Sequence, residues 1–227
     1  MDEIEIQCKG RDIIIDGMDP SRVTTINIKL EDILTEPINT VFPLNVDDLN
    51  KILDKLEDTT VMLEKKLRDK KDYIKLSSNG ESYTLYLLDL ELEHLPTVNL
   101  RKINYDKKYE INRGKLEKII EKAKIYSDIL FIQYDSIGIQ YYSVGQIGEF
   151  TKTERMVEKQ GQCAYNLTFL KSVVKNTENL FVKPFTLYTK NDHPLHIEYV
   201  DKGIEYHQWL APWVEDSDFD DDFDDEW

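Results

Sequence analysis

GMDPSRV, at residues 17–23, is the predicted corner between two strands. Ile13-Ile14-Ile15 precedes it, and the segment that follows it, TTINIKL, alternates apolar and polar residues. Alternation with a period of two is typical of a strand that is buried on one face. A proline fixes its own φ angle and restricts the residue before it, so Pro20 makes the corner rigid. The sequence therefore predicts a hairpin that holds Met18 and Val23 on either side of one tight bend.

Two further segments carry distinctive residues: NDHPLHIEY at residues 191–199 and WLAPWVE at residues 209–215. Together with the corner at 17–23, they resemble in order and separation three signatures of the sliding-clamp family of DNA replication, the proliferating cell nuclear antigen in its archaeal-type form. The resemblance implies an α+β chain with the DNA-clamp fold. In that fold two similar domains, each an antiparallel sheet with helices, place their helices along the interior of a ring.

The charge of the chain is strongly acidic. The formal net charge is −15, and eight acidic residues fall within residues 216–226, so that −7 remains without them. An acidic chain as a whole repels nucleic acid, because affinity for phosphates comes from Lys and Arg side chains. Whether this chain can bind nucleic acid therefore depends on where its basic residues lie. No apolar run approaches the roughly 20 residues that cross a bilayer, and no signal segment is present. We expect no membrane association, with a cytoplasmic, nucleoid-associated location in an archaeal or viral host and a nuclear one in a eukaryote.

The chain divides into two halves with the same order of predicted elements. Each half contains a hairpin, a further strand, an amphipathic helix with an asparagine cap, and closing strands. The two helices, at residues 45–56 and 166–175, are offset by about 120 residues, which indicates a duplicated α+β unit rather than a solenoid. A strand at 109–112 and a helix at 113–127 open the second half without a counterpart in the first. We therefore expect an N-terminally shortened first domain that exposes a strand edge and part of an apolar sheet face.

The predicted domain boundaries follow from this repeat and from composition. They are a shortened clamp N-terminal domain at 1–89, an interdomain connector at 90–108, a clamp C-terminal domain at 109–215 and an acidic disordered tail at 216–227. Within the tail, Phe219, Phe223 and Trp227 recur every four residues, which would align them on a transient helix. Two interpretations stay open: a solubilising tail, or aromatic side chains that dock into a clamp pocket or a partner.

Lysines recur on the predicted helices. Lys115, Lys118 and Lys122 are spaced at i, i+3 and i+7, so they form one stripe opposite the apolar side of helix 113–127. The other two helices each carry a pair one turn apart, which are Lys171 and Lys175, and Lys51 and Lys55. One interpretation is a solvated helix face. Under the resemblance, the lysines line a channel and contact only the phosphates of double-stranded DNA, without sequence preference.

The resemblance also implies a hydrophobic pocket for partner peptides. Its expected lining comes from four parts of the chain: Met18, Arg22 and Val23; Leu95, Pro96 and Val98; Pro194; and Trp209, Leu210, Ala211 and Pro212. The alternative is that Met18, Val23 and Leu95 are core residues. Trp213 stands where the family has Arg or Lys, which removes a basic contact and adds apolar area.

Subunit contact is the third expected site. In the family, the last strand of domain one adds to the edge of a strand in the neighbour's domain two and closes a trimer. Here these strands are expected at residues 81–89 and 149–157. The residues assigned to the interface are Tyr83, Leu85, Leu87, Thr151, Thr153 and Arg155. Ordinary pairing inside a sheet is the alternative.

Signals of catalysis are weak in this sequence. The four histidines, His94, His193, His196 and His207, occur singly, and there is no Gly-rich phosphate loop and no Gly-x-Ser-x-Gly motif. The carboxylates of the tail have no scaffold to hold an ion. Cys8 and Cys163 are isolated and are interpreted as reduced structural thiols. We expect no enzymatic activity, no metal site and no cofactor.

The sequence therefore predicts a DNA sliding-clamp subunit, a polymerase processivity factor that works as a homotrimer or in an assembly with another clamp subunit. Its expected partners are a DNA polymerase, a clamp loader, a flap endonuclease and a ligase, bound through clamp-interacting peptides and tethered at high effective concentration. The first alternative is a truncated clamp-like protein that does not close a ring and modulates or competes with a full-length clamp. The second is a scaffold that does not bind DNA.

Overall fold

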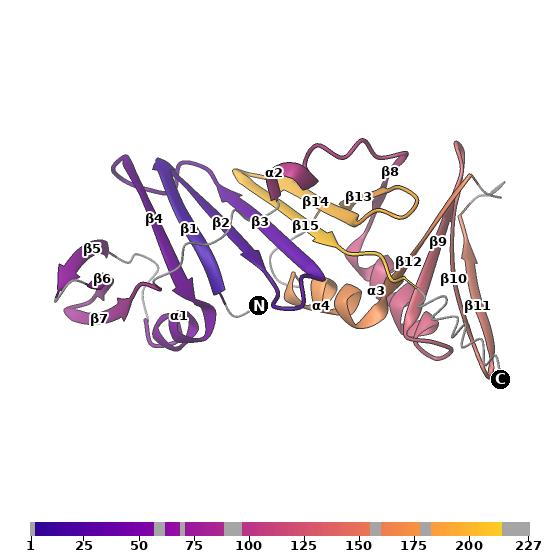
Figure 1. The fold of residues 1–227 in the computed structure, drawn as a ribbon, viewed down its shortest axis with the longest axis horizontal. Coiled ribbons are helices and arrows are strands. Elements are labelled where there is room, and N and C mark those ends of the chain that lie inside the picture. Colours follow the sequence, from indigo (N-terminus) through magenta and orange to yellow (C-terminus); the bar gives the residue numbers. More distant parts are fainter. Residues whose placement is uncertain are drawn as a thin grey trace, which may run out of the picture.

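The computed structural model describes residues 3–56, 62–68, 71–88, 97–154, 160–177 and 183–214. Within these ranges the chain is α+β, and every strand pairing is antiparallel. Figure 1 shows an elongated molecule with a small sheet at each end and a larger sheet between them. Leu95, Pro96, Arg155 and the tail at 216–227, about which the sequence makes predictions, lie outside the described residues.

The first half of the chain contains seven strands and one helix in its described part. These are β1 (Glu3–Gly10), β2 (Asp12–Met18), β3 (Thr24–Leu30), β4 (Ile38–Asn45), α1 (Val46–Leu53), β5 (Met62–Arg68), β6 (Lys71–Ser78) and β7 (Glu81–Tyr86). A short helix, α2 (Thr97–Leu100), lies in the expected connector.

The second half is longer by one strand and one helix. Its elements are β8 (Lys107–Ile111), α3 (Arg113–Ala123), β9 (Ile129–Tyr134), β10 (Ile139–Gly145), β11 (Gly148–Thr153), β12 (Gly161–Asn166), α4 (Leu167–Asn176), β13 (Phe185–Thr189), β14 (Leu195–Asp201) and β15 (Ile204–Leu210). Because β8 begins at Lys107, the predicted boundary at residue 109 falls inside a strand.

The two halves repeat one order of elements: four strands, a helix and three strands. In the described residues, β8 and α3 have no counterpart in the first half, as the sequence predicts. The prediction omits two strands, β4 and its counterpart β12. Pro43 argues against a strand in β4, but β4 is the edge of its sheet, where a proline removes no ladder hydrogen bond that the fold needs.

The largest sheet joins the two halves. Its strand order is β4-β1-β2-β3-β15-β14-β13-β8. The junction is the pairing of β3 with β15, whose register runs from Ile204 opposite Leu30 to Leu210 opposite Thr24. The remaining strands form a three-stranded sheet, β5-β6-β7, and a four-stranded sheet, β11-β10-β9-β12. Residues far apart in the sequence are therefore fixed side by side by backbone hydrogen bonds.

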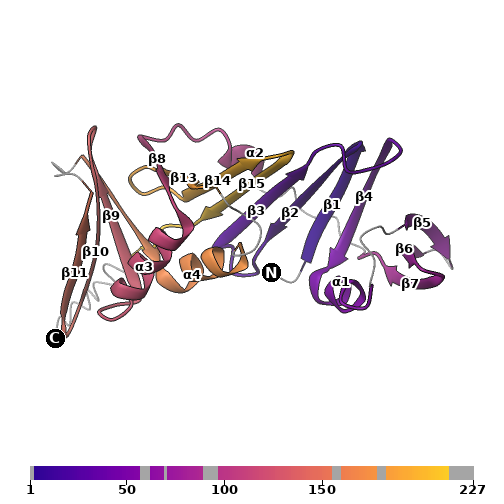
Figure 2. The same ribbon diagram turned by 180° about the vertical axis from the view of Figure 1, so that it is seen from behind.

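The helices divide between two sides of the central sheet. Figure 1 shows α1, α3 and α4 along one side and α2 on the other, and Figure 2 shows the same division from behind. Two helices begin at asparagine caps, as predicted: Asn45 accepts a hydrogen bond from the backbone N–H of Asp48 at 3.1 Å, and Asn166 from that of Thr168 at 2.8 Å. All described helices are too short or too polar to cross a lipid bilayer.

The molecule has two apolar cores of unequal size. The main core lies in the second half and includes the fully buried side chains of Tyr141, Tyr165 and Phe185, together with one face of α3. The smaller core lies in the first half around Phe42 and Ile74. No residue of α1 is fully buried, and several apolar side chains of this half are strongly exposed, among them Leu53, Val41, Met62 and Tyr86. Exposed apolar side chains also occur in the second half, so they do not by themselves mark the uncovered sheet face that the sequence predicts for the first.

Candidate binding surfaces

The corner at residues 17–23 is held by Asp19. Its buried carboxylate accepts hydrogen bonds from the backbone N–H groups of Ser21, at 3.1 Å, and of Thr24. Its backbone N–H donates to the carbonyl of Thr24 at 3.0 Å, and Arg22 adopts a left-handed φ of 59°. Asn and Asp side chains commonly close turns in this way. The side chain of Asp19 therefore closes the corner together with Pro20.

The corner lies beside the segment that follows β15. The backbone N–H of Ala211 donates to the carbonyl of Val23 at 2.8 Å, and the hydroxyl of Thr24 donates to the carbonyl of Trp209 at 3.3 Å. Met18 is paired with Thr25, and Thr25 with Trp209, so Met18 and Trp209 share one sheet face two strands apart, roughly 10 Å. The structure thus brings together the two ends of the expected peptide pocket.

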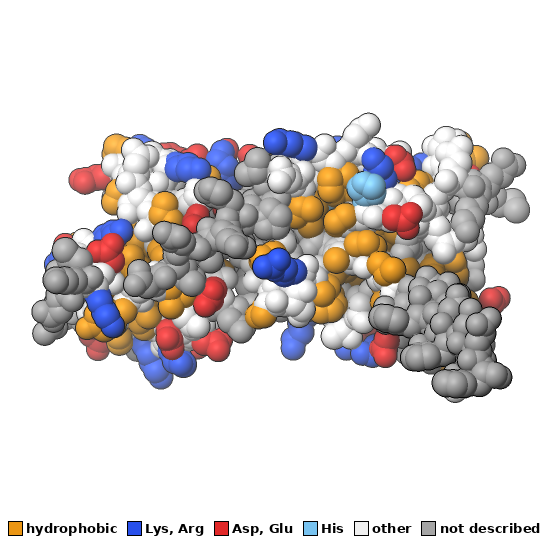
Figure 3. Space-filling view, viewed as in Figure 1, with side chains coloured by type: hydrophobic (Ala, Val, Ile, Leu, Met, Phe, Trp, Pro, Cys, Tyr) orange, Lys and Arg blue, Asp and Glu red, His pale blue; other side chains and the backbone are white. Residues whose placement is uncertain are grey.

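The other expected pocket residues have different environments. Pro194, Ala211 and Pro212 are half-buried, and Arg22 is exposed. Val98 lies in α2, on the side of the sheet that carries the connector. Leu210 points to the opposite face of the sheet and is fully buried in the main core, so it offers no surface to a peptide. Figure 3 shows hydrophobic side chains gathered near the centre of the face it presents, over β14, β15 and the chain that follows.

A buried cluster of aromatic and histidine rings lies between the sheet and the connector. The ring of His196 stacks on that of Trp209, with centroids 4.7 Å apart, and its Nε2 lies 3.0 Å from Nδ1 of His207. Tyr105 of the connector packs on His196 at 5.8 Å between ring centroids. Burial lowers the pKa of His196 to about 3 and also lowers the pKa of His207. Both rings are therefore neutral at pH 7.

Sequence reasoning treats the histidines as single residues and misses this cluster. The signal that could reveal it is the register of the hairpin formed by β14 and β15, which places His196 opposite Trp209 and Glu198 opposite His207. Within the described ranges, no three side chains of His, Cys, Asp or Glu lie close enough together to hold a metal ion. Cys8 and Cys163 are buried free thiols.

The predicted lysines of α3 surround a surface hollow of about 410 Å³. Lys152 of β11 and the ring of Phe150 complete its lining, so four lysines face one space that no described carboxylate lines. One of them is partly neutralised, because Nζ of Lys115 lies 2.5 Å from Oε1 of Glu154. Lys152 is not among the residues predicted from the sequence, although its place on an exposed strand next to α3 makes it part of the same basic surface. The lining residues are Asn112, Gly114, Lys115, Lys118, Ile119, Lys122, Phe150 and Lys152.

The predicted lysines of α4 lie on the other flank of α3. Lys171 and Lys175 line a second hollow of about 400 Å³ together with Lys124 and two acidic residues of α3, Glu117 and Glu121. The two groups of lysines are thus on the same side of the molecule but are separated by a pair of carboxylates. In the first half, Lys51 pairs with Asp48 at 2.8 Å, and Lys55 is exposed just after α1.

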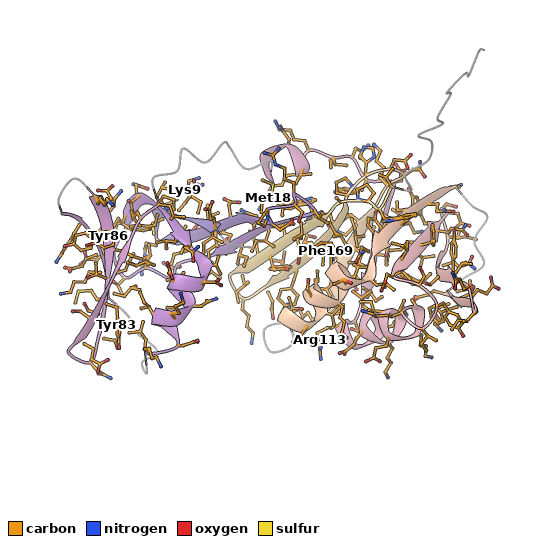
Figure 4. All side chains as sticks on the ribbon, turned by 60° about the horizontal axis from the view of Figure 1, so that its bottom comes forward. Lys9, Met18, Tyr83, Tyr86, Arg113 and Phe169 are labelled. Atoms are coloured by element: carbon orange, nitrogen blue, oxygen red, sulfur yellow. The ribbon has the colours of Figure 1, made fainter. Side chains whose placement is uncertain are left out.

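Two strand edges lie at opposite ends of the molecule. Among the described residues, β7 pairs only with β6, and β11 pairs only with β10. Figure 4 shows Tyr83 and Tyr86 of β7 at one end, whereas Met18 lies near the middle; β11 is at the far end in Figure 1. Thr151 and Thr153 are exposed, and Leu85 is buried in the small core. The backbone edges, rather than the side chain of Leu85, are the surface available for contact.

Two curated relatives of this chain share one name, DNA polymerase sliding clamp. No protein-family model matches the chain. A DNA polymerase sliding clamp from Cenarchaeum symbiosum is 26% identical over 231 residues, which cover 94% of this chain and 90% of the relative. A protein of the same name from Nitrosopumilus maritimus is 26% identical over 226 residues, covering 88% of this chain and 84% of the relative.

A solved structure shares the fold. It is the complex described as the C-terminal region of FEN-1 bound to A. fulgidus PCNA, with a TM-score of 0.73 and 16% identity over 95% of this chain and 91% of that one. The architecture is therefore the DNA-clamp fold that the sequence predicts. The chain is thus similar over nearly its whole length to two sliding clamps, and it carries the three signatures at 17–23, 191–199 and 209–215.

Proposed function

We propose that this protein is a subunit of a DNA sliding clamp, a processivity factor without catalytic activity of its own. The observation that carries the proposal is the separation of three surfaces on one molecule. Lysine-bearing helices lie on one side, the connector helix α2 lies on the other, and free strand edges lie at the two ends. A ring that encloses DNA and recruits enzymes on its outside needs these three surfaces in this arrangement.

The strand edges support a head-to-tail assembly. A contact between β7 of one subunit and β11 of the next uses two different patches, so it generates a closed ring if the rotation between subunits closes. Backbone pairing between two edge strands would also remove the exposed hydrogen-bonding groups of both. We assign the backbone edges of these strands and the residues Tyr83, Leu87, Thr151, Thr153 and Arg155 to this interface, with a homotrimer as the closed form; Leu85 contributes only its backbone, because its side chain is buried.

The helix side suits contact with DNA phosphates. Lysine carries a flexible point charge that neutralises phosphate without reading bases, which permits sliding. The strongest contribution comes from the hollow at α3, where four lysines face one space. Lys51 and Lys55 of α1 contribute less, because Asp48 already pairs with Lys51. Both relatives are archaeal clamps, and we place this protein beside DNA in the cytoplasm of its host.

The outer side suits a partner peptide. The half-buried Met18, Pro194, Ala211 and Pro212 provide apolar walls around the corner, and the connector closes one side. The related PCNA structure holds the C-terminal region of FEN-1, which supports a flap endonuclease as one partner of this protein. A DNA polymerase, a clamp loader and a ligase are further proposed partners through peptides of the same kind.

The test asks whether the protein encircles DNA. The protein is threaded over the ends of a linear duplex, and both ends are then blocked with bound streptavidin. We expect retention on DNA at high salt when both ends are blocked, and rapid loss when one end is open. Equal loss from blocked and open DNA would contradict encirclement, because phosphate contacts alone weaken steeply with salt.

The second candidate is a clamp-like protein that does not close a ring. The smaller apolar core of the first half favours it, because this half buries fewer apolar side chains among the described residues than the second. Such a protein would bind a full-length clamp and show no difference between blocked and open DNA.

A further inference from the structure

A buried polar pair lies on the connector side of the central sheet. Asp16 of β2 and Asn27 of β3 are register partners, and each is only 6% exposed. The amide Nδ2 of Asn27 donates to Oδ1 of Asp16 at 2.6 Å. Buried polar groups of this kind need all their hydrogen bonds, so the remaining acceptor of Asn27 requires a donor.

Arg101 of the connector supplies that donor. Its Nη2 donates to Oδ1 of Asn27. The orientation of the Asn27 amide follows from chemistry, because a guanidinium can only donate and a carboxylate can only accept. Burial raises the pKa of the Asp16 carboxyl, while the hydrogen bond from Asn27 and the charge of Arg101 oppose that rise. Arg101, Asn27 and Asp16 thus form a chain of hydrogen bonds from the connector into the sheet.

The connector has a second attachment four residues later. Tyr105 packs on the rings of Tyr188 and His196, at 5.7 and 5.8 Å between centroids. The backbone N–H of Asp106 then donates to the carbonyl of Thr189 at 3.1 Å. The first attachment is to β3, and the second is to β13 and β14. Because β15 lies between these strands in the sheet, the connector crosses β15, the strand that carries Trp209.

We infer that Arg101 and Asn27 are positioning residues that fix the connector as one wall of the partner-peptide pocket. The inference rests on the proposed function, because it assumes that the pocket binds peptides. Neither residue needs to touch the peptide. Without the Arg101 hydrogen bond, the part of the connector at α2 is held less firmly on β3, and a peptide must then order it when it binds, which lowers the affinity of the peptide.

The experiment uses the full chain and measures amide hydrogen exchange together with peptide binding. The test variants are Arg101→Ala and Asn27→Leu. The double variant Asp16→Asn with Asn27→Asp serves as the rescue, because it keeps both the net charge and the chain of donors and acceptors. Lys102→Ala, at an exposed neighbouring position, is the matched control. The probe is a synthetic peptide with the C-terminal region of FEN-1.

We expect exchange at the amides of Lys102 and Ile103, which donate to Asn99 and Leu100, to accelerate about tenfold in both test variants. The amide of Asp106, at the second attachment, should keep its protection. Peptide affinity should fall about three- to tenfold, mainly through faster dissociation. The double variant and Lys102→Ala should resemble the wild type in both measurements.

Unchanged exchange at Lys102 and Ile103 in Arg101→Ala and Asn27→Leu would overturn the inference. So would accelerated exchange with unchanged peptide affinity, since the attachment would then not serve the pocket. A wild-type chain that binds no peptide would contradict the proposed function. Hydrogen exchange at Lys102 and Ile103 would still show whether the Arg101–Asn27 hydrogen bond holds the connector on the sheet.

Discussion

Gly145 and Gly114 differ in the space that their surroundings leave for a side chain. A Cβ atom at Gly145 would overlap the backbone carbonyl of Tyr126, whereas one at Gly114, in the first turn of α3, would meet nothing within 4 Å. We predict that Gly145→Ala lowers the free energy of unfolding by about 1–3 kcal/mol or more, because backbone cannot move aside easily. Gly114→Ala should raise it by about 0.5–1 kcal/mol.

Urea denaturation of the two glycine variants beside the wild type measures both effects. Equal stability of Gly145→Ala and the wild type would show that the turn after β10 does not pack on Tyr126 as described.

His196 makes stability depend on pH. Its pKa is about 3 in the folded chain and about 6.5 when unfolded, because burial opposes the charged ring. Between these values the unfolded state binds a proton that the folded state does not, so stability falls as the pH drops below 6.5. The loss approaches about 1.4 kcal/mol per pH unit for this group.

Carboxylates also titrate at low pH, so the measurement is a difference between variants. The stability lost from pH 7 to pH 5 should be smaller in His196→Phe than in the wild type, and unchanged in His193→Phe. The same loss in all three proteins would contradict the buried position of His196.

The contacts of single residues are the part of this structure that the sequence predicts least well. Pro20 explains a rigid corner, but the hydrogen bonds of Asp19 depend on where the chain returns at Thr24. Leu210 belongs to a clamp signature, yet strand alternation buries it beside an accessible signature residue, Ala211. The contact of His196 with His207 requires the register of two strands, which no local pattern supplies.

At the scale of elements, the proposed contact with DNA depends most on α3. Replacement of Lys118 and Lys122 by Ala removes two charges from the hollow shared with β11. We predict weaker binding to duplex DNA and a salt dependence whose slope falls by about one for each phosphate contact that is lost.

The control for the helix variants is Lys29→Ala. Lys29 lies in β3 two residues from Asn27, on the connector side of the central sheet, and pairs with Glu31 at 2.8 Å. A slope that falls as much in Lys29→Ala as in the α3 variants would show that contact with DNA is not confined to the helix side.

The proposed assembly depends on the edge of β11. Successive backbone N–H groups of a strand point to opposite edges, so of two neighbouring residues one faces β10 and the other faces outward. We predict that one of Thr151→Pro and Lys152→Pro keeps the melting temperature of the subunit but blocks assembly. The other should lose stability, because it breaks a bond to β10.

Light scattering and thermal melting separate the two proline variants. An assembly that survives both substitutions would exclude β11 from the interface.

Elements are predicted better than residues in this chain. Asparagine caps and apolar periodicity locate α1 and α4, and the duplication gives the order of the strands. The strands β4 and β12 are missed because their residues are polar or include a proline, and their place in the sheets depends on partners distant in sequence. The long helix predicted at 113–127 ends at Ala123, followed by a turn.

At the scale of the whole molecule, the chain combines a net charge of −15 with a local concentration of lysines on the helix side. This distribution favours a protein that repels DNA in general but accepts it against one surface. The continuous central sheet joins the two halves through β3 and β15, beside which the corner lies.

The most direct test is the mass of the purified full-length chain in solution, measured by sedimentation equilibrium over a wide range of concentrations. The subunit mass is 26.8 kDa, so a ring closed through β7 and β11 predicts a species of three subunits, about 80 kDa. A species of 26.8 kDa at every concentration, with no larger form, would contradict the closed ring.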